Sequence, residues 1–206
     1  MYKKIALLSI ISIFSINGCS SATHRALKAP QKRFANVEIN SNKYLSSQES
    51  NEVLSYINSI RNKGAKCAPP APPLYSNGAL ERAAISHSKD MAINNFLQHN
   101  GSGTELDAAK PKGALHSTFV DRITYYGYPV KPNLLVGENI TFTKFKNTKS
   151  SKFSDNYKKA VDNWLNDEQH CKILMNPRFT YAGVGYQKTR DKYYFTLDLA
   201  EKNVAK

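Results

Sequence analysis

The sequence predicts an α+β fold in which helices pack against an antiparallel sheet. Apolar residues recur at helical spacing in stretches that dominate the first half of the chain. Two stretches near the C-terminus, residues 181–187 and 192–199, instead alternate with the two-residue period of half-buried strands. This order of helical patterns followed by strand patterns is expected when helices and an antiparallel sheet form separate layers.

The first predicted helix covers about residues 47–63. Ser46 and Glu49 fit a capping box at its start, and Gly64 is a stop signal. The prolines of residues 67–73 cannot continue this helix, because they lack amide donors and enforce an extended backbone. The apolar face consists of Val53, Leu54, Ile57 and Ile60.

Three further helices follow. The second covers about residues 77–95, and its small alanines would let another layer approach closely. The third covers 118–126, with Ser117 as its cap and Gly127 as its stop. The fourth covers about 155–168. Its apolar stripe contains Tyr157, Ala160, Val161, Trp164 and Leu165.

The two predicted C-terminal strands are joined by a polar turn at residues 188–191, which is typical of a hairpin. Residues 140–145 are predicted to add a third strand.

The N-terminus has the charged, apolar and small-residue regions of a secretory signal peptide. Its apolar run, residues 5–16, is too short to span a bilayer. Gly18 directly before Cys19, with Ile16 three residues before the cysteine, resembles the bacterial lipobox, in which the cysteine is acylated and begins the mature chain. The alternative is an ordinary cleaved signal in which Cys19 is incidental.

The lipobox interpretation divides the chain into a signal peptide at 1–18, an acylated cysteine with a basic flexible tether at 19–45, and a domain at 46–206. It predicts an exported protein that a palmitate-type lipid anchor holds to a membrane of the cell envelope. Ser20 stands where inner-membrane retention uses aspartate, which favours the outer membrane if the source is Gram-negative.

The chain is strongly basic, with a formal net charge of +13. Such a charge favours anionic surroundings. The basic residues are scattered, and no nucleic-acid motif accompanies them, so we expect an anionic envelope component rather than nucleic acid as a partner. The lysine-rich segment 144–152 is either a solvated loop or a binding surface.

If Cys19 is acylated, Cys67 and Cys171 remain, and an exported protein has an oxidising environment in which they can pair. Such a disulfide would close a loop of about 100 residues and stabilise the domain by about 4 to 5 kcal/mol in the chain-entropy estimate. The alternative is a pair of buried free thiols.

Five segments together carry a resemblance to bacterial members of the CAP superfamily (cysteine-rich secretory proteins, antigen 5, pathogenesis-related 1), the SCP-like extracellular domain. The resemblance runs from about residue 50 to 200, through residues 80–91, 96–99, 126–128, 137–140 and 164–185. It implies an α-β-α sandwich with a small antiparallel sheet between helical layers. A subset of bacterial members carries the same cysteine pair.

The resemblance also implies a central cleft that in several members binds a divalent metal, often zinc. His99, Glu138, Asp167 and His170 match its histidines and acidic residues. The segment Asp-Glu-Gln-His before Cys171 departs from the usual Ser-Pro-Gly-His. Two histidines with one or two carboxylates would leave room for water at a bound metal.

Other roles are open for some of these polar residues. Glu138 could instead accept hydrogen bonds from backbone amides around Gly137. His87 is expected on the packed face of its helix, as a core residue or as support for the cleft. His24 and His116 are expected in loops.

Two functions from different classes follow. The first is a non-enzymatic envelope lipoprotein whose cleft binds a lipid, glycan or peptide. The second is a metal-dependent hydrolase, peptidase-like or directed at the cell wall, with Glu138 or Asp167 as general base. No nucleophile elbow or His-Glu-x-x-His helix is present in the sequence, which favours the binding protein.

Overall fold

A computed structural model describes residues 47–146 and 151–202 of the 206-residue chain. The predicted signal peptide, Cys19, the tether, His24 and the capping residue Ser46 therefore lie outside the described residues. Within the described residues, no helix is long and apolar enough to cross a membrane.

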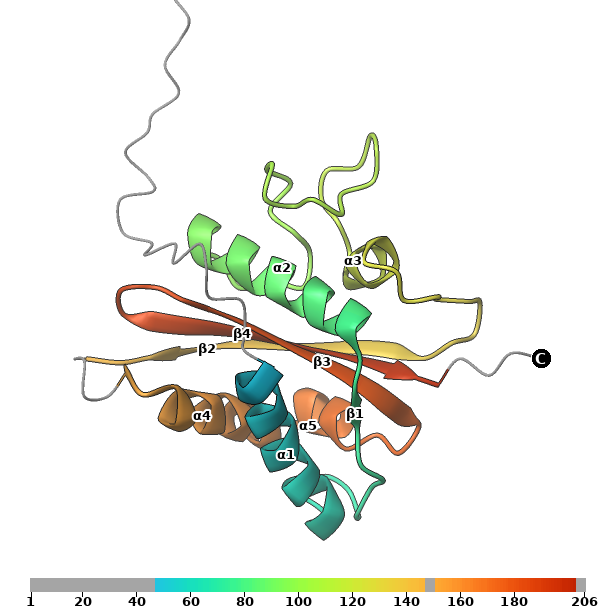
Figure 1. Cartoon of the computed structure of the whole chain (residues 1–206), viewed down its shortest axis with the longest axis vertical. Coiled ribbons are helices and arrows are strands. Elements are labelled where there is room, and N and C mark those ends of the chain that lie inside the picture. The colour runs from blue at the N-terminus through green and yellow to red at the C-terminus, as the bar shows by residue number, and fades with distance from the viewer. Residues whose placement is uncertain (1–46, 147–150, 203–206) are drawn as a thin grey trace, which may run out of the picture. The chain divides into compact units, whose positions relative to one another are not determined.

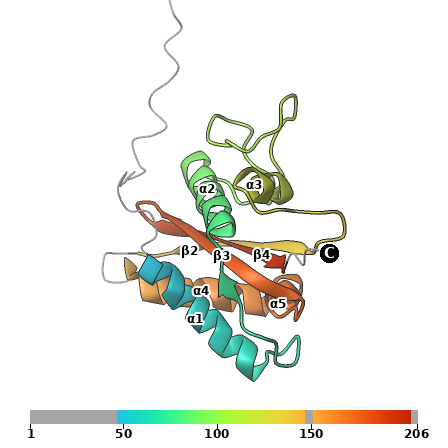
Figure 2. The same ribbon diagram turned by 45° about the vertical axis from the view of Figure 1, so that its right-hand side comes forward.

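The described residues form three layers, with a sheet between two groups of helices (Figures 1 and 2). One face of the sheet carries α2 (Gly78–Asn94) and α3 (Phe119–Tyr125). The other face carries α1 (Ser47–Lys63), α4 (Phe153–Asn166) and α5 (Glu168–Leu174). The predicted α-β-α sandwich is confirmed.

The sheet has the strand order β1-β3-β4-β2. The antiparallel strands β2 (Val136–Lys144), β3 (Phe179–Lys188) and β4 (Lys192–Glu201) make up most of it. A two-residue strand, β1 (Tyr75–Ser76), pairs with β3 in parallel, so the sheet is mixed rather than purely antiparallel as predicted.

The central strand β4 departs from the predicted half-buried alternation. All residues of 193–200 are buried, because helices cover both faces of the sheet at this strand. The larger core lies between the sheet and the α1, α4 and α5 layer, and includes Ile57, Trp164, Leu174, Phe195 and Leu197.

Helix α2 lies directly on β3, as its small alanines predicted. A Cβ atom added at Gly185 would lie 2.1 Å from the backbone carbon of Ala84, and one at Gly183 would meet the backbone at Leu80 and Glu81 equally closely. The absence of side chains at these two glycines therefore sets the spacing between helix and sheet.

Several predicted boundaries need correction. The N-cap of α3 is Thr118 rather than Ser117, because Thr118 and Asp121 form a reciprocal capping box. Strand β2 begins four residues earlier than predicted. The fourth predicted helix is interrupted at Asp167, whose extended backbone ends α4 and whose side chain caps the separate helix α5.

Cys67 and Cys171 form a disulfide with a sequence separation of 104 residues, which confirms the predicted pair over the alternative of free thiols. The bond ties the segment after α1 to α5, which carries His170.

Candidate functional site

A cleft of about 600 Å³ lies along the first residues of β2, beside α5. All four residues that the sequence predicts for the cleft, His99, Glu138, Asp167 and His170, line it. The rest of its lining is largely apolar and includes Phe119, Leu135, Val136, Ile173 and Phe179. The structure therefore brings residues from distant parts of the sequence to one site.

Gly137 lets the cleft form against β2. A Cβ atom at this position would lie 2.9 Å from the ring of Phe179 and 3.3 Å from the side chain of Ile173. A larger residue would therefore displace two of the apolar side chains that line the cleft.

Glu138 holds His99 and Arg122 together. Nδ1 of His99 donates to Oε1 of Glu138 at 2.8 Å, and Arg122 donates to Oε2 at 2.7 Å. Both carboxylate oxygens thus accept from side chains, and not from backbone amides around Gly137 as the alternative interpretation expected. Because a carboxylate oxygen only accepts, Nδ1 of His99 carries the proton and Nε2 is the remaining ring nitrogen.

Arg122 also positions the loop that carries His99. It donates to the backbone oxygen of His99 at 2.8 Å and to the hydroxyl of Ser117 at 3.1 Å. The Arg122 side chain is only 2% exposed, and that of Glu138 is fully buried. Burial alone would raise the pKa of Glu138, but the hydrogen bond from His99 and the charge of Arg122 lower it below its usual value. The carboxylate is therefore ionised at neutral pH.

A second buried acidic residue lies next to Glu138 on the adjacent strand. Asp198 on β4 is its register partner across the β2–β4 pair. Burial, together with the negative charge of Glu138, raises the pKa of Asp198 well above its usual value against the opposing charge of Arg122, which favours the neutral form of this side chain. In its protonated form Asp198 can donate a hydrogen bond to Glu138, and this interaction also raises its pKa.

His87 lies on the packed face of α2, as predicted, and is fully buried. Its Nε2 donates to the backbone oxygen of Gln98 at 2.9 Å, next to the cleft residue His99. Burial lowers the pKa of His87 to about 4, against the opposing effect of Glu138. His87 is therefore a neutral residue that supports the loop of His99 and does not enter the cleft.

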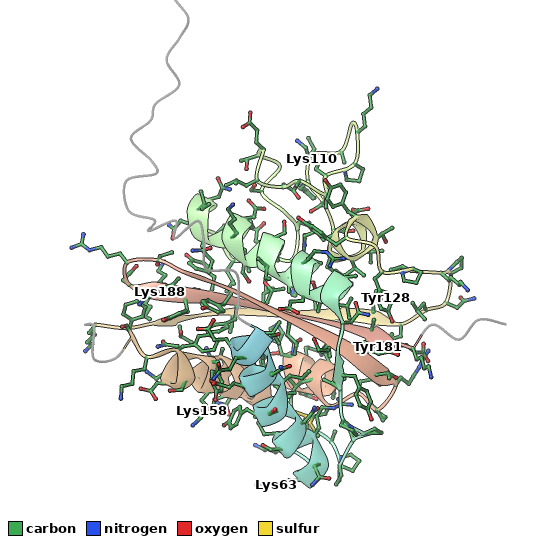
Figure 3. The ribbon with its side chains drawn as sticks, viewed as in Figure 1. Lys63, Lys110, Tyr128, Lys158, Tyr181 and Lys188 are labelled. Carbon is green, nitrogen blue, oxygen red and sulfur yellow. A yellow bond between two sulfur atoms is a disulfide. The ribbon has the colours of Figure 1, made fainter. Side chains whose placement is uncertain are left out.

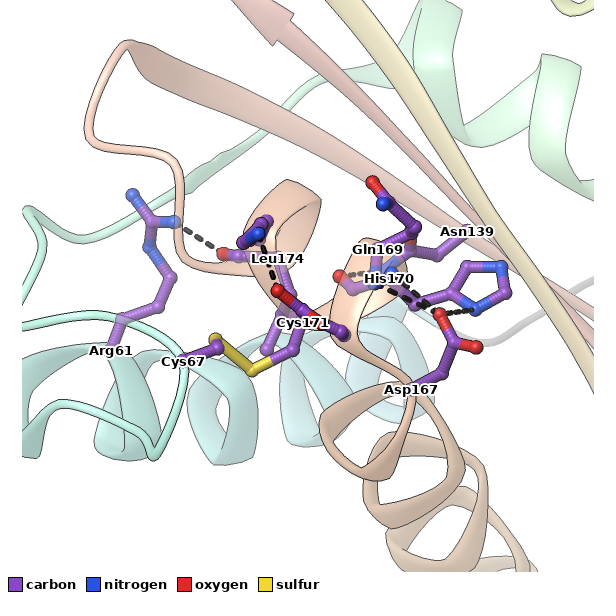
Figure 4. Close-up of a disulfide and its surroundings, with 10 residues drawn as sticks. Arg61, Cys67, Asn139, Asp167, Gln169, His170, Cys171 and Leu174 are labelled. Carbon is purple, nitrogen blue, oxygen red and sulfur yellow. Dashed lines mark hydrogen bonds and ion pairs between the residues drawn. A yellow bond between two sulfur atoms is a disulfide. The ribbon is translucent and has the colours of Figure 1, made fainter.

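On the other side of the cleft, Asp167 orients His170 (Figure 4). Its Oδ1 accepts from the backbone amides of Gln169 and His170 at 3.1 and 3.0 Å, and Nδ1 of His170 lies 3.0 Å from the same oxygen. The hydrogen bond from the His170 amide is the main reason that the pKa of Asp167 lies below its usual value. The carboxylate therefore caps α5 and fixes the ring of His170 at once.

Three further contacts hold α5 in place (Figure 4). Asn139 on β2 donates to the backbone oxygen of His170 at 2.9 Å. The buried side chain of Arg61 donates to the backbone oxygens of Leu174 and Asn176 at the other end of the helix. The disulfide at Cys171 attaches the middle of α5 to the segment after α1.

The two histidine rings face a shared space, with ring centroids 6.2 Å apart. In each ring, Nδ1 is engaged by a carboxylate, which leaves Nε2 for another partner. A carboxylate on the second ring nitrogen is the usual way to orient a metal-binding histidine. Within the described residues, however, no group of three His, Cys, Asp or Glu side chains is arranged to hold a metal ion. The two histidines could supply two imidazole ligands to a metal ion. Water or a bound molecule would have to complete the coordination of that ion.

Some residues of the site could not be singled out from sequence. Arg122 lies on a short predicted helix, where an arginine ordinarily faces solvent. Asp198 is one polar residue in a strand pattern. Both residues lie next to Glu138 in the structure, and nothing in the sequence indicates this proximity.

The three-layer fold is that of an SCP domain. The family model of the cysteine-rich secretory protein family (CAP) matches residues 54–199, and the chain belongs to this family.

Among curated relatives, the uncharacterized protein YkwD of Bacillus subtilis is 30% identical over 116 residues, which cover 55% of this chain and 35% of that protein. The uncharacterized membrane protein YlbC of the same organism is 29% identical over 119 residues, which cover 58% of this chain and 26% of that protein. The matched region thus spans about a third or less of these relatives.

The chain is also similar to solved structures, which include the following two. An extracellular protein of Bacillus anthracis that contains an SCP domain has a TM-score of 0.55 and 26% identity, with 75% of this chain and 41% of that chain covered. An outer surface protein of Borrelia burgdorferi has a TM-score of 0.51 and 16% identity, with 76% of this chain and 95% of that chain covered. The second likeness concerns the fold alone.

Proposed function

We propose that this protein is an exported lipoprotein of the cell envelope that binds an amphipathic ligand in the cleft between His99 and His170. The N-terminal sequence supports export and acylation at Cys19, with an outer-membrane location if the source is Gram-negative. Domains of the CAP family are generally non-enzymatic, which agrees with a binding role. The observation that carries the proposal is an apolar cleft with two oriented imidazoles in its wall.

The lining indicates the chemistry of the ligand. Phe119, Ile173 and Phe179 offer an apolar surface, which suits an acyl chain or an apolar peptide side chain better than a glycan. The Nε2 atoms of His99 and His170 would bind the polar end of the same molecule. His99 is about half exposed, with 48% of its side chain accessible, so a ligand can reach it without a change of fold.

A fluorescent fatty acid such as dansyl-undecanoate tests this proposal on the exported chain with Cys19→Ser. We expect saturable binding that Leu135→Glu abolishes, because the new carboxylate would lie in the apolar lining. Leu115→Glu is the matched control, since Leu115 is 83% exposed and lies outside the cleft. Equal binding by both variants would contradict the proposal.

A divalent metal, with zinc as the first candidate, could bridge the ligand and the two histidines. Two imidazoles suit zinc, but two protein ligands alone predict weak binding. Calorimetric titration of zinc should lose its signal in His99→Ala and in His170→Ala and keep it in His116→Ala. An unchanged titration in both cleft variants would remove the metal from the proposal.

The hydrolase alternative finds less support in the geometry. A general base works best with a pKa near the operating pH, whereas the pKa values of Glu138 and Asp167 are both lowered. Each carboxylate is also committed to a histidine. We therefore expect no turnover of casein or peptidoglycan. Turnover that is lost in Glu138→Ala would favour the enzyme instead.

Acylation can be tested separately from the cleft. Cells that express the full chain should incorporate labelled palmitate into it, and Cys19→Ser should lose the label. Label that persists in this variant would contradict the lipid anchor.

A further inference from the structure

The end of the sheet opposite the cleft brings together lysines that form no ion pair with an acidic residue in the described part of the chain. Lys144 on β2 and Lys192 on β4 are register partners on adjacent strands. Like charges directly opposite each other destabilise a sheet. Among the described residues, no carboxylate forms an ion pair with either of them or with Lys188 at the end of β3. Among the described residues, Nζ of Lys192 donates only to neutral oxygens, those of Asn95 and Tyr194.

Aromatic rings lie beneath these lysines. The Nζ atoms of Lys144 and Lys192 lie 5.7 and 5.2 Å from the centroid of the same ring, that of Phe142. Lys188 lies 5.5 Å from the centroids of both Phe145 and Tyr193. The rings attract each ammonium group but carry no net charge, so the positive charge remains available to an anion.

The three lysines lie on both faces of this end of the sheet. Phe142, Lys144 and Lys192 belong to the face that α2 covers, since Phe142 packs in the cluster of Met91 and Ala92. Lys188 lies over rings of the opposite face, which pack against the α1 and α4 layer. Figure 3 shows Lys188 at one end of the sheet, and Tyr128 and Tyr181 toward the other. We call Lys144, Lys188 and Lys192, with the rings of Phe142 and Phe145, the lysine–aromatic end.

This surface is separate from the cleft. Strand β2 begins in the cleft at Val136 and ends at Lys144. The cleft lining reaches Glu138 on this strand, and at about 3.4 Å per residue the six steps from Glu138 to Lys144 span roughly 20 Å. A partner bound at this end would therefore leave the cleft open.

We propose that the lysine–aromatic end docks on an anionic phospholipid bilayer and holds the domain with its cleft away from the lipid surface. Half-buried aromatic rings under long lysine side chains are suited to the headgroup region, where the stems contact apolar atoms and the ammonium groups contact phosphate. Charges on both faces of one sheet end fit a flat anionic surface better than a single strand of polymer. The segment 144–152, which the sequence left as either a loop or a binding surface, begins here, although residues 147–150 lie outside the described part of the chain.

Vesicle flotation of the exported chain with Cys19→Ser tests this inference without the lipid anchor. We expect binding to phosphatidylcholine vesicles that contain phosphatidylglycerol, little binding to pure phosphatidylcholine, and a loss of binding with added salt. The triple variant K144Q/K188Q/K192Q should bind more weakly by on the order of a hundredfold.

The control K63Q/K89Q/K131Q removes the same charge from exposed lysines elsewhere and should bind like the parent chain. Dansyl-undecanoate binding should persist in both triple variants, which shows that they are folded and separates this inference from the proposed cleft ligand. Equal losses in the two triple variants would overturn the proposal. So would an absence of vesicle binding by the parent chain, or equally tight binding to soluble polyphosphate.

Discussion

Glu138 determines the character of the site at the scale of single residues. It accepts from His99 and Arg122 and stays ionised, while Asp198 behind it keeps its proton. The pKa values of two neighbouring buried carboxyl groups are thus shifted in opposite directions, because His99 and Arg122 donate to Glu138, whereas burial and the charge of Glu138 outweigh the charge of Arg122 at Asp198. The sequence motif pointed to Glu138 and both cleft histidines. It could not identify Asp198 or Arg122, since their roles depend on pairing across strands and on contact between separate loops.

The neutral state of Asp198 predicts a dependence of stability on pH. Its pKa is raised in the folded chain, and the unfolded chain loses this proton near pH 4, so the free energy of unfolding should fall as the pH rises above about 4. Asp198→Asn has no proton to lose, and this fall should shrink. Urea unfolding at a series of pH values measures it, with the exposed Asp162→Asn as control. A pH dependence that Asp198→Asn leaves unchanged would show that Asp198 is ionised in the fold.

At the scale of elements, the helical and strand patterns predicted α1, α2, α3 and the β3–β4 hairpin well, but not where α4 ends. The apolar stripe of α4 continues close to His170, and only the capping role of Asp167 separates α4 from α5. Capping depends on backbone geometry that periodicity does not report. The two-residue strand β1 was equally beyond prediction, since its pairing with β3 is formed between distant segments.

Removal of the cap should disturb both α5 and His170. In Asp167→Ala, the amides of Gln169 and His170 lose their acceptor, and the ring of His170 loses its partner. We expect faster amide hydrogen exchange at the start of α5 and a lower unfolding midpoint. Glu168→Ala removes only the exposed pair with Lys172 and should change both quantities less. A larger effect of Glu168→Ala would contradict the capping role.

The contact of α2 with β3 should not tolerate a methyl group. Gly185→Ala places a Cβ atom 2.1 Å from the backbone of Ala84, so helix and strand must separate. We expect a loss of at least about 2 kcal/mol in the free energy of unfolding. Gly78→Ala is the control, because its Cβ atom would meet only the end of Arg82 at 3.5 Å. Equal stability of the two variants in urea would refute the close contact.

At the scale of the whole described domain, the resemblance to the CAP family predicted the layers and the disulfide, and the structure confirms both. The sandwich places a cleft at the start of β2 and the lysine–aromatic end at its far end. The sequence showed the lysines of this end only as a scattered basic composition, because their grouping depends on the register of β2 with β4. Arg61 and the disulfide join the α1 region to α5 and so support the cleft from a distance.

The disulfide should contribute a large share of the stability. Its loop of 104 residues corresponds to about 4 to 5 kcal/mol in the chain-entropy estimate. The double variant Cys67→Ala/Cys171→Ala should lose about this amount in urea unfolding, and reduction of the parent chain should have a similar effect. Exposed Lys66→Ala, next to Cys67, is the control. A double variant as stable as the parent would show that packing alone holds α5.

The most direct test concerns the two rings that share the cleft. Nitrogen NMR of the histidine side chains, at a pH where both rings are neutral, reports which nitrogen carries the proton. His99 and His170 should both have the proton on Nδ1, with Nε2 open to the cleft, and Glu138→Gln should change the signals of His99 and leave those of His170 in place. Protons on Nε2 in both rings of the parent chain would contradict the carboxylate-oriented pair on which the proposed binding site depends.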